Sequence, residues 1–207
     1  MSKRLAILGA SGHGKVVAEI ALACGWREIV FFDDAWPDLF NNGYFDVVGN
    51  TEALVEQILN FDGVHVAIGN NSVRLEKFKF FHSLGASLPP LVHPRSVISK
   101  SSSLGDGTVV MAGSVVNPGT IISSACILNT GSTVDHDCSI GEGVHVSPGV
   151  NVAGGVKIGS LSWVGIGAVV IQCVTIGSDV LVGAGSVVLS DVPDGICVAG
   201  VPAISIS

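Results

Sequence analysis

His136 is the residue of this sequence best placed to do acid–base chemistry. It stands between Asp135 and Asp137 in a short segment that runs from Val134 to Cys138. Carboxylates on either side of an imidazole can orient the ring and raise its basicity, and a neutral imidazole is a natural proton acceptor for an amine nucleophile near pH 7. The pattern therefore favours a general base, although an ordinary surface histidine in a polar corner would have the same neighbours.

A glycine-rich segment near the N-terminus, residues 9–14, is the second candidate. Its sequence G-A-S-G-H-G follows an apolar run and opens a helical pattern, and the N–H groups at a helix N-terminus favour a phosphate. The order G-x-x-G-x-G differs from the G-x-G-x-x-G of dinucleotide-binding folds. We interpret it as part of a nucleotide or nucleotide-sugar site. The alternatives are a plain glycine-rich turn and an NAD-dependent dehydrogenase, for which this region is short.

Polar residues follow the next two apolar runs. Asp33 and Asp34 come after residues 29–32, where a ribose-binding acid would lie, and Asn70 comes after residues 64–68. Because ligands collect at the carboxyl ends of parallel strands, we expect the three strand ends to form one site. The residues expected to bind the nucleotide-linked sugar are Gly12, His13, Gly14, Asp33, Asp34 and Asn70.

The elements that would position this site alternate between strand and helix over residues 1–90. The expected strands are residues 5–8, 29–32 and 64–68; the expected helices are residues 15–24, 51–58 and 72–84, with Thr51 as a possible N-cap. This alternation predicts a small Rossmann-like α/β domain with a parallel sheet. A proline-rich connector, residues 88–94, ends it.

From residue 98 onward an aliphatic residue recurs at every sixth position. The sixteen matches are Ile98, Leu104, Val110, Val116, Ile122, Leu128, Val134, Ile140, Val146, Val152, Ile158, Val164, Val170, Ile176, Val182 and Val188. A small or β-branched residue follows four positions after each, often preceded by glycine. A hexapeptide period is typical of a parallel β-helix. Three hexapeptides make one triangular coil, so we expect about five coils with the aliphatic side chains inside. The predicted domains are residues 1–90 (α/β) and 91–207 (β-solenoid).

Composition limits the possible functions. The formal net charge of −7 argues against a nucleic-acid surface, and no apolar run approaches the roughly 18–20 residues that span a bilayer. No signal-peptide pattern follows Met1, which favours a cytoplasmic protein. With 13% charged residues, the chain is expected to bury surface in an oligomer. The five cysteines show no metal-ligand spacing and are expected to be buried free thiols.

A zinc enzyme is an alternative that the histidines raise. Hexapeptide solenoids include zinc carbonic anhydrases, whose open catalytic sites need three histidine ligands. Here the repeats contain His136 and His145, and His93 precedes them. We therefore expect no metal site.

Taken in order, these segments resemble the left-handed β-helix N-acetyltransferases that act on nucleotide-linked amino sugars, the PglD-like and perosamine N-acetyltransferase-like group. NeuD-type sialic-acid O-acetyltransferases are related to it. The resemblance spans nearly the whole chain and rests on residues 9–14, 32–34, 67–71, 91–94, 128–130, 134–141, 145–149 and 200–203. It implies a left-handed β-helix, a homotrimer, and acetyl-CoA bound between neighbouring prisms.

The resemblance also implies roles for single residues. His136 matches the general base, Asp137 the acid that supports it, and Gly154 a backbone N–H aimed at the thioester oxygen. The other positions that match the acetyl-CoA site are His145 at the acetyl donor, Ile166 and Ala184 along the channel, and Val201 and Pro202 at the adenine. The implied reaction is direct transfer, so Cys138 is expected to serve packing alone.

The C-terminus departs from the family pattern. Relatives usually carry Lys or Arg after G-V-P-A, whereas this chain continues Ile204-Ser205-Ile206-Ser207. Lys100 and Lys157 are the only basic residues after position 95, so the CoA phosphates must use them, backbone amides or a neighbouring subunit.

We expect an acetyl-CoA-dependent N-acetyltransferase for a UDP-linked 4-amino-4,6-dideoxy sugar of bacterial glycan synthesis. The alternatives are a GDP-perosamine N-acetyltransferase, a sialic-acid O-acetyltransferase and a non-catalytic scaffold.

Overall fold

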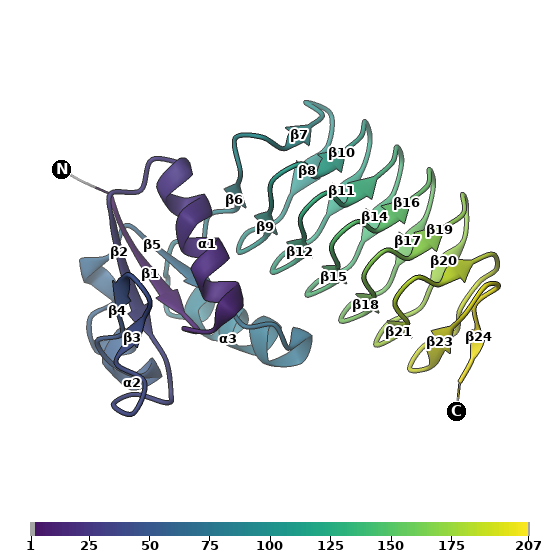
Figure 1. Cartoon of the computed structure of the whole chain (residues 1–207). Coiled ribbons are helices and arrows are strands. Elements are labelled where there is room, and N and C mark those ends of the chain that lie inside the picture. The colour runs from purple at the N-terminus through teal and green to yellow at the C-terminus, as the bar shows by residue number, and fades with distance from the viewer. Residues whose placement is uncertain (1–2, 207) are drawn as a thin grey trace. The chain divides into compact units, whose positions relative to one another are not determined.

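The computed structural model describes residues 3–206, which belong to two compact units, Met1–His93 and Pro94–Ser207 (Figure 1). Ser207, the last residue of the atypical C-terminus, lies outside the described residues. In the part of the chain that the structure describes, no helix combines the length and the apolar character needed to cross a membrane.

The first unit is built on a parallel three-stranded sheet in the order β2-β1-β5. Its elements are β1 (Arg4–Leu8), α1 (Gly12–Ala23), β2 (Glu28–Phe32), β3 (Asn41–Asn42), β4 (Phe45–Asp46), α2 (Thr51–Glu56), a 3₁₀ turn (Ile58–Asn60), β5 (Gly63–Val66), α3 (Asn71–Ser83) and β6 (Leu91–Val92). The apolar residues of the central strand β1 are buried, as expected for a parallel sheet covered by helices. The predicted α/β fold is confirmed.

Local details of this unit differ from the prediction. Helix α1 begins at Gly12 rather than Lys15. The N-cap of α2 is Asn50, whose side chain accepts the Ala53 N–H, so Thr51 is the first helical residue and not the cap. Strand β5 ends at Val66, before residue 68, and the antiparallel pair β3–β4 was not predicted.

The second unit is a parallel solenoid of two-residue strands (Figure 1). One sheet contains β7 (Val97–Ile98), β10 (Val115–Val116), β13 (Thr133–Val134), β16 (Asn151–Val152), β19 (Val169–Val170) and β22 (Val187–Val188). A second contains β8 (Ser103–Leu104), β11 (Ile121–Ile122), β14 (Ser139–Ile140), β17 (Lys157–Ile158) and β20 (Thr175–Ile176). The third contains β9 (Val109–Val110), β12 (Ile127–Leu128), β15 (His145–Val146), β18 (Trp163–Val164), β21 (Leu181–Val182), β23 (Cys197–Ala199) and β24 (Ile204–Ser205).

The hexapeptide period sets this architecture. Each of the sixteen predicted aliphatic residues is the second residue of a strand, and all except Ile98 and Leu104 in the first coil are buried. From β7 to β22 paired residues lie eighteen positions apart, as in Thr133 with Asn151, whereas the last coil is two residues shorter and pairs Leu181 with Cys197. The solenoid has about six coils rather than five, because β23 and β24 extend the third sheet past the last predicted hexapeptide.

Each corner of the solenoid needs one residue in the left-handed backbone region. Positive φ angles recur at every sixth residue from Gly107 to Gly185, one position before the small inward residue. Glycine adopts this conformation without steric cost and occupies most of these positions. The five exceptions are Ala125, Asp137, Leu161, Cys173 and Asp179.

Small hydroxyl residues at the corners bond successive coils to one another. The buried Thr120 hydroxyl donates to the Asp135 carbonyl at 2.6 Å and accepts the Cys138 N–H at 3.1 Å. Thr108 and Ser162 make the same pair of bonds at their own corners. A single hydroxyl thereby satisfies both a carbonyl and an N–H of the next coil, which explains this residue type at the position.

A basic cluster lies inside the first unit. His65 on β5 and Arg74 on α3 are each 1% exposed, and the Arg74 guanidinium donates to the carbonyls of Ile68 and Gly69. Burial, and next the electrostatic interactions with His13 and Arg74, lower the pKa of His65 to about 3. His65 is therefore neutral at physiological pH.

Replacing His65 tests this arrangement. Between pH 6.5 and pH 3 the unfolded chain binds a proton at His65 that the folded protein does not, so the free energy of unfolding falls as the pH falls. One such group contributes at most about 1.4 kcal/mol per pH unit. Urea unfolding between about pH 7 and pH 4.5 should show a flatter pH dependence for His65→Gln than for the wild type.

The exposed His82 on α3 provides the matched control. His82→Gln should retain the wild-type dependence, because this ring stays in water in both states. The same slope in His65→Gln and the wild type would contradict the assignment.

Candidate active site

His136 lies at the corner between β13 and β14, as its spacing of two residues from the inward Val134 predicts. Its side chain is 60% exposed, and Nδ1 lies 2.9 Å from Oδ2 of Asp137. An ionised carboxylate can only accept a hydrogen bond, so Nδ1 carries the proton and a neutral ring has its lone pair on Nε2. The corner thus presents an oriented imidazole with a free proton acceptor toward solvent.

Two carboxylates strengthen this imidazole as a base. The hydrogen bond with Asp137, and next the negative charge of Asp135, raise the pKa of His136 above its ordinary value of 6.5, against a smaller opposing effect of burial. The Asp135 carboxylate accepts the His136 backbone N–H and an Asn117 amide N–H, and both bonds lower the pKa of Asp135.

Asp137 occupies one of the left-handed corner positions. Its φ is 59°, a conformation that most non-glycine residues avoid but that aspartate tolerates better than most. The residue below it in the preceding coil is Gly119, where an added Cβ would lie 2.5 Å from Asp137 Oδ1. A glycine under the carboxylate therefore leaves the space in which Asp137 can reach the imidazole.

Gly154 lies one coil above His136, against the face of its ring. A Cβ added at Gly154 would lie 2.6 Å from both Cε1 and Nε2 of His136. Gln172 occupies the same position one coil further on, so the corner backbone itself accepts a side chain there. Within residues 3–206 the Gly154 N–H has no hydrogen-bond acceptor. The imidazole and an available backbone donor therefore adjoin each other.

His145 lies on β15 and belongs to a different face of the solenoid. It is 8% exposed, and its ring stacks on Trp163 with 4.9 Å between centroids. Asn129 Oδ1 accepts the Thr130 N–H, so Nδ2 of Asn129 faces His145 Nε2 at 3.2 Å and must donate to it. The Trp163 indole N–H in turn donates to the Ser147 hydroxyl. In this arrangement Nε2 of His145 accepts the hydrogen bond from Asn129.

The residues expected along the acetyl-CoA channel are exposed. Ile166 and Ala184 lie eighteen residues apart at the corner after β18 and β21, and Gly185 N–H donates to the Ile166 carbonyl. Val201 and Pro202 are exposed in the turn before β24. This corner is not the corner of His136 and Gly154, so one chain carries the expected residues as two separate groups.

The glycine-rich loop of the first unit is explained largely by packing. Gly9, with φ of 107°, lies against the Ala67 carbonyl, and an added Cβ at Gly14 would collide with Gly9 O. Gly12 is exposed, with no atom near its missing side chain. Asp33 Oδ2 accepts the Ala10 N–H at 2.7 Å, which joins the ends of β1 and β2.

The other residues expected at this edge are also engaged within the protein. Asn70 is the N-cap of α3 and accepts the Val73 N–H. Burial alone would raise the pKa of Asp34, but hydrogen bonds from Thr51 and the nearby Lys77 outweigh it and lower the pKa. The strand ends meet as predicted, with several polar groups already paired.

His13, in the first turn of α1, is held neutral. Burial, and next the charge of Arg74, lower its pKa to about 4. Its Nε2 is buried without a hydrogen-bond partner among the described residues, so that nitrogen faces the protein interior. Any contact of His13 with a ligand must use another part of the ring.

The cysteines differ in burial from the prediction. None of the five is in a disulfide, but Cys24 and Cys173 are exposed and Cys197 is half-buried. Cys24 ends α1, and Cys173 occupies an outward corner position. Cys138 is buried, its thiol donates to the Ala153 carbonyl, and burial raises its pKa. Within residues 3–206 no three His, Cys, Asp or Glu side chains group as metal ligands.

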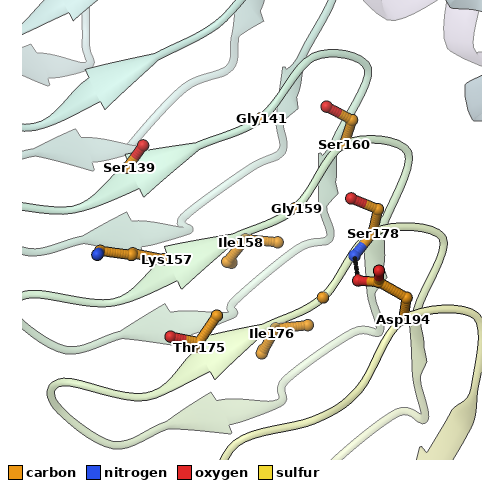
Figure 2. Close-up of a pocket in the computed structure, with 11 residues that line it drawn as sticks. Ser139, Gly141, Lys157, Ile158, Gly159, Ser160, Thr175, Ile176, Ser178 and Asp194 are labelled. Atoms are coloured by element: carbon orange, nitrogen blue, oxygen red, sulfur yellow. Dashed lines mark hydrogen bonds between the residues drawn. The ribbon is translucent and has the colours of Figure 1, made fainter.

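A shallow pocket of about 350 Å³ lies on the sheet that contains β14, β17 and β20 (Figure 2). Lys157, Ser139 and Thr175 line it from the strands, and Ser178 and Asp194 from a corner. The Ser178 N–H donates to Asp194 at 2.7 Å. Lys157 is one of the two lysines of the solenoid, so this pocket contains one of the few positively charged side chains of that unit.

Sequence reasoning missed three residues that support the candidate site: Asn117, Asn129 and Trp163. Each contacts an expected residue in an adjacent coil. Asn117 and Asp135, like His145 and Trp163, are eighteen residues apart. Reading the sequence in columns of eighteen would have found both pairs.

Comparison with known proteins gives matches for both units. Residues 4–81 match the family profile of the PglD N-terminal domain. Over 113 residues the chain is 37% identical to the UDP-N-acetylbacillosamine N-acetyltransferase of Bacillus subtilis (strain 168). That match covers 53% of this chain and 52% of the relative, so it spans about half the length of each protein.

Solved structures match over essentially the whole chain. The acetyltransferase domain of PglB from Neisseria gonorrhoeae FA1090, in complex with acetyl coenzyme A, is 42% identical with a TM-score of 0.95, and the match covers 100% of both chains. PerB from Caulobacter crescentus, in complex with CoA and GDP-perosamine, is 40% identical with a TM-score of 0.92, covering 98% of this chain and 97% of that one.

Gly154→Ala tests the contact between Gly154 and the imidazole. The added methyl group must displace the ring, which lies at the end of a rotatable side chain, so stability should change little. The acetyl transfer implied by the sequence should fall about 100-fold, because a misplacement of about 1 Å can cost this much. The main-chain N–H is retained, so the loss reports on the ring. His136→Ala/Gly154→Ala should lose no more than His136→Ala; an additive loss would contradict the contact.

Asp137→Asn tests the charge beside His136. Asparagine keeps an oxygen acceptor and tolerates the left-handed conformation, but it removes the negative charge. The pKa of His136, followed by histidine NMR, should move down toward its ordinary value. Asp179→Asn is the matched control, since Asp179 has φ of 54° at another corner. Equal His136 titration in the wild type and Asp137→Asn would refute this electrostatic role.

Proposed function

The chain belongs to the PglD-like family of left-handed β-helix sugar N-acetyltransferases, and on this basis we propose that it transfers an acetyl group from acetyl-CoA to the amine of a nucleotide-linked amino sugar. The observation that carries the proposal is the His136 corner. There an imidazole fixed by Asp137 lies against Gly154, whose N–H has no acceptor within the described residues. A base and an oxyanion donor at one point are what acyl transfer to an amine requires.

The proposed reaction is a direct transfer. The neutral sugar amine attacks the thioester carbonyl carbon, and Nε2 of His136 takes a proton from the amine as the C–N bond forms. The Gly154 N–H stabilises the oxyanion of the tetrahedral intermediate. The C–S bond then breaks, and the proton held by His136 neutralises the departing CoA thiolate. Cys138 takes no part, since its thiol is buried and its pKa is raised by that burial.

The proposed substrate is a UDP-linked 4-amino-4,6-dideoxy sugar of bacterial glycan synthesis. The name of the Bacillus relative supports a UDP sugar. The GDP-perosamine held by PerB supports the GDP-linked alternative over a longer match. In this proposal residues 1–90 bind the nucleotide-linked sugar and residues 91–207 carry out acetyl transfer. Within the first part the sugar nucleotide would contact Gly12, His13, Asp33 and Asp34 at the strand ends.

The acetyl-CoA site is proposed to form between neighbouring copies in a homotrimer. His136 and Gly154 lie at one corner, whereas Ile166 and Ala184 lie at another. Outward residues of β18, β19 and β21, namely Trp163, Val169 and Leu181, are exposed apolar side chains in this single chain. Joining the two corners across a subunit interface would cover these apolar groups and complete the channel that ends at Val201 and Pro202.

Few side chains are available for the CoA phosphates in this arrangement. We assign one phosphate contact to Lys157, which lines the pocket of Figure 2. Backbone N–H groups and the neighbouring subunit supply the others. No metal takes part in the proposed reaction.

An acceptor panel tests the function. Purified protein is incubated with acetyl-CoA and UDP- or GDP-linked 4-amino sugars, and CoA release is followed. Because Cys24 and Cys173 are exposed thiols, loss of the thioester absorbance is preferable to a thiol reagent. The wild type should turn over a UDP-linked sugar, and His136→Ala should lose about 10²- to 10⁴-fold.

The exposed His82 provides the control, and His82→Ala should keep the wild-type rate. Turnover of the GDP sugar alone would move the protein to the perosamine branch with the same chemistry. Turnover of free sialic acid alone would indicate O-acetylation. No transfer to any acceptor would reject the proposal.

A further inference from the structure

Asn117 makes a side-chain contact with the catalytic corner from the coil below. It follows β10 and is half-buried, and its Nδ2 donates to Asp135 Oδ1 at 2.8 Å. The same oxygen accepts the His136 backbone N–H at 2.8 Å. One carboxylate oxygen therefore accepts two hydrogen bonds, which together restrain the Asp135 carboxylate.

The solenoid fold does not require this contact. Ala153 and Ile171 occupy the corner position of Asn117 and Asp135 in the next two coils, and both are apolar. The Thr120 hydroxyl bonds at the same corner recur at Thr108 and Ser162 and thus belong to the fold. Among these contacts, the Asn117–Asp135 hydrogen bond is specific to the coil that carries His136.

The contact matters because two carboxylates flank one imidazole. Nδ1 of His136 bonds to Asp137, and this orientation places the ring against Gly154. A mobile Asp135 carboxylate would compete for Nδ1 or draw the ring out of this position. Because Asn117 restrains Asp135, the His136 ring bonds to the Asp137 carboxylate alone and keeps one orientation.

We propose that Asn117 is a positioning residue for the general base: by binding the Asp135 carboxylate it reserves Nδ1 of His136 for Asp137 and keeps Nε2 beside Gly154. The role of the base itself rests on the proposed function. Asn117 touches neither substrate nor imidazole and acts through Asp135.

The same bond affects charge as well as geometry. The hydrogen bond from the His136 N–H, and next that from Asn117, lower the pKa of Asp135, so this carboxylate stays ionised. Asp135 and Asp137 are the charged groups that act on the His136 ring, and Pro118 and Gly154 in the adjacent coils are uncharged. The restraint on Asp135 therefore also keeps its negative charge at a constant position near His136, where it raises the pKa of the imidazole.

Three variants separate restraint from simple structural support. Asn117→Ala frees the Asp135 carboxylate and should lower kcat about 10- to 100-fold with little change in the KM for acetyl-CoA, because it misplaces the base. Asp135→Ala removes the competing carboxylate and should cost less. The double variant should recover to the level of Asp135→Ala, since no carboxylate remains to be restrained. A double variant slower than Asn117→Ala would overturn the proposal.

One measurement does not depend on the acceptor. Histidine ¹⁵N NMR should show Nδ1-protonated His136 in the wild type and a mixture of ring environments in Asn117→Ala. Unchanged His136 signals in that variant would overturn the proposal even where the acceptor is unknown. Asn151→Ala is the matched control: this asparagine lies on the outer face of β16 and bonds to Thr133 and the Gly149 carbonyl rather than to Asp135, so the His136 signals should stay as in the wild type.

Discussion

From β7 to β22, each coil of the solenoid is bonded to the next through residues eighteen positions apart, as Val115 is with Thr133 and Thr133 with Asn151. A strand of two residues has almost no stability of its own, so these bonds and the aliphatic stack inside them hold every corner in place. The position of His136 follows from this constraint. In the preceding coil, Asn117 binds Asp135 and Gly119 leaves space for Asp137. In the following coil, Gly154 leaves space for the His136 ring.

The corner that carries His136 differs from the other corners of the solenoid in only a few contacts. Backbone bonds and the Thr120 hydroxyl are those of an ordinary corner, and the aspartate at the left-handed position recurs at Asp179, whereas the hydrogen bond from asparagine to aspartate across the coils is particular to this corner. The backbone of Asp137 is held in the left-handed conformation by a bond to the preceding coil, in which its N–H donates to the Pro118 carbonyl. Few substitutions within a regular scaffold therefore distinguish the corner that carries His136.

Much of the fold follows from the sequence, because one period repeats sixteen times and each match is a strand in the structure. The three strand ends of the first unit were also predictable, since parallel strands end at one edge. The contacts of Asn117 and Trp163 were not predicted, because they depend on which residues stack once the coils form. The burial of Arg74 was not predictable from the sequence, since a charged helical residue is normally exposed. The burial of His13 Nε2 was not predictable either, because it depends on how the side chains pack.

The eighteen-residue register also restricts how the length of this protein can vary. Loss of one residue would turn the inward aliphatic side chains of later strands out toward solvent. Loss of six would keep them inside but move each later residue to another face, and such a loss between His136 and Gly154 would separate these two residues. Loss of eighteen removes one whole coil and shortens the stack by about 4.8 Å with all faces aligned. Within the regular coils, a change of length that keeps every later strand on its own face therefore comes in multiples of eighteen residues.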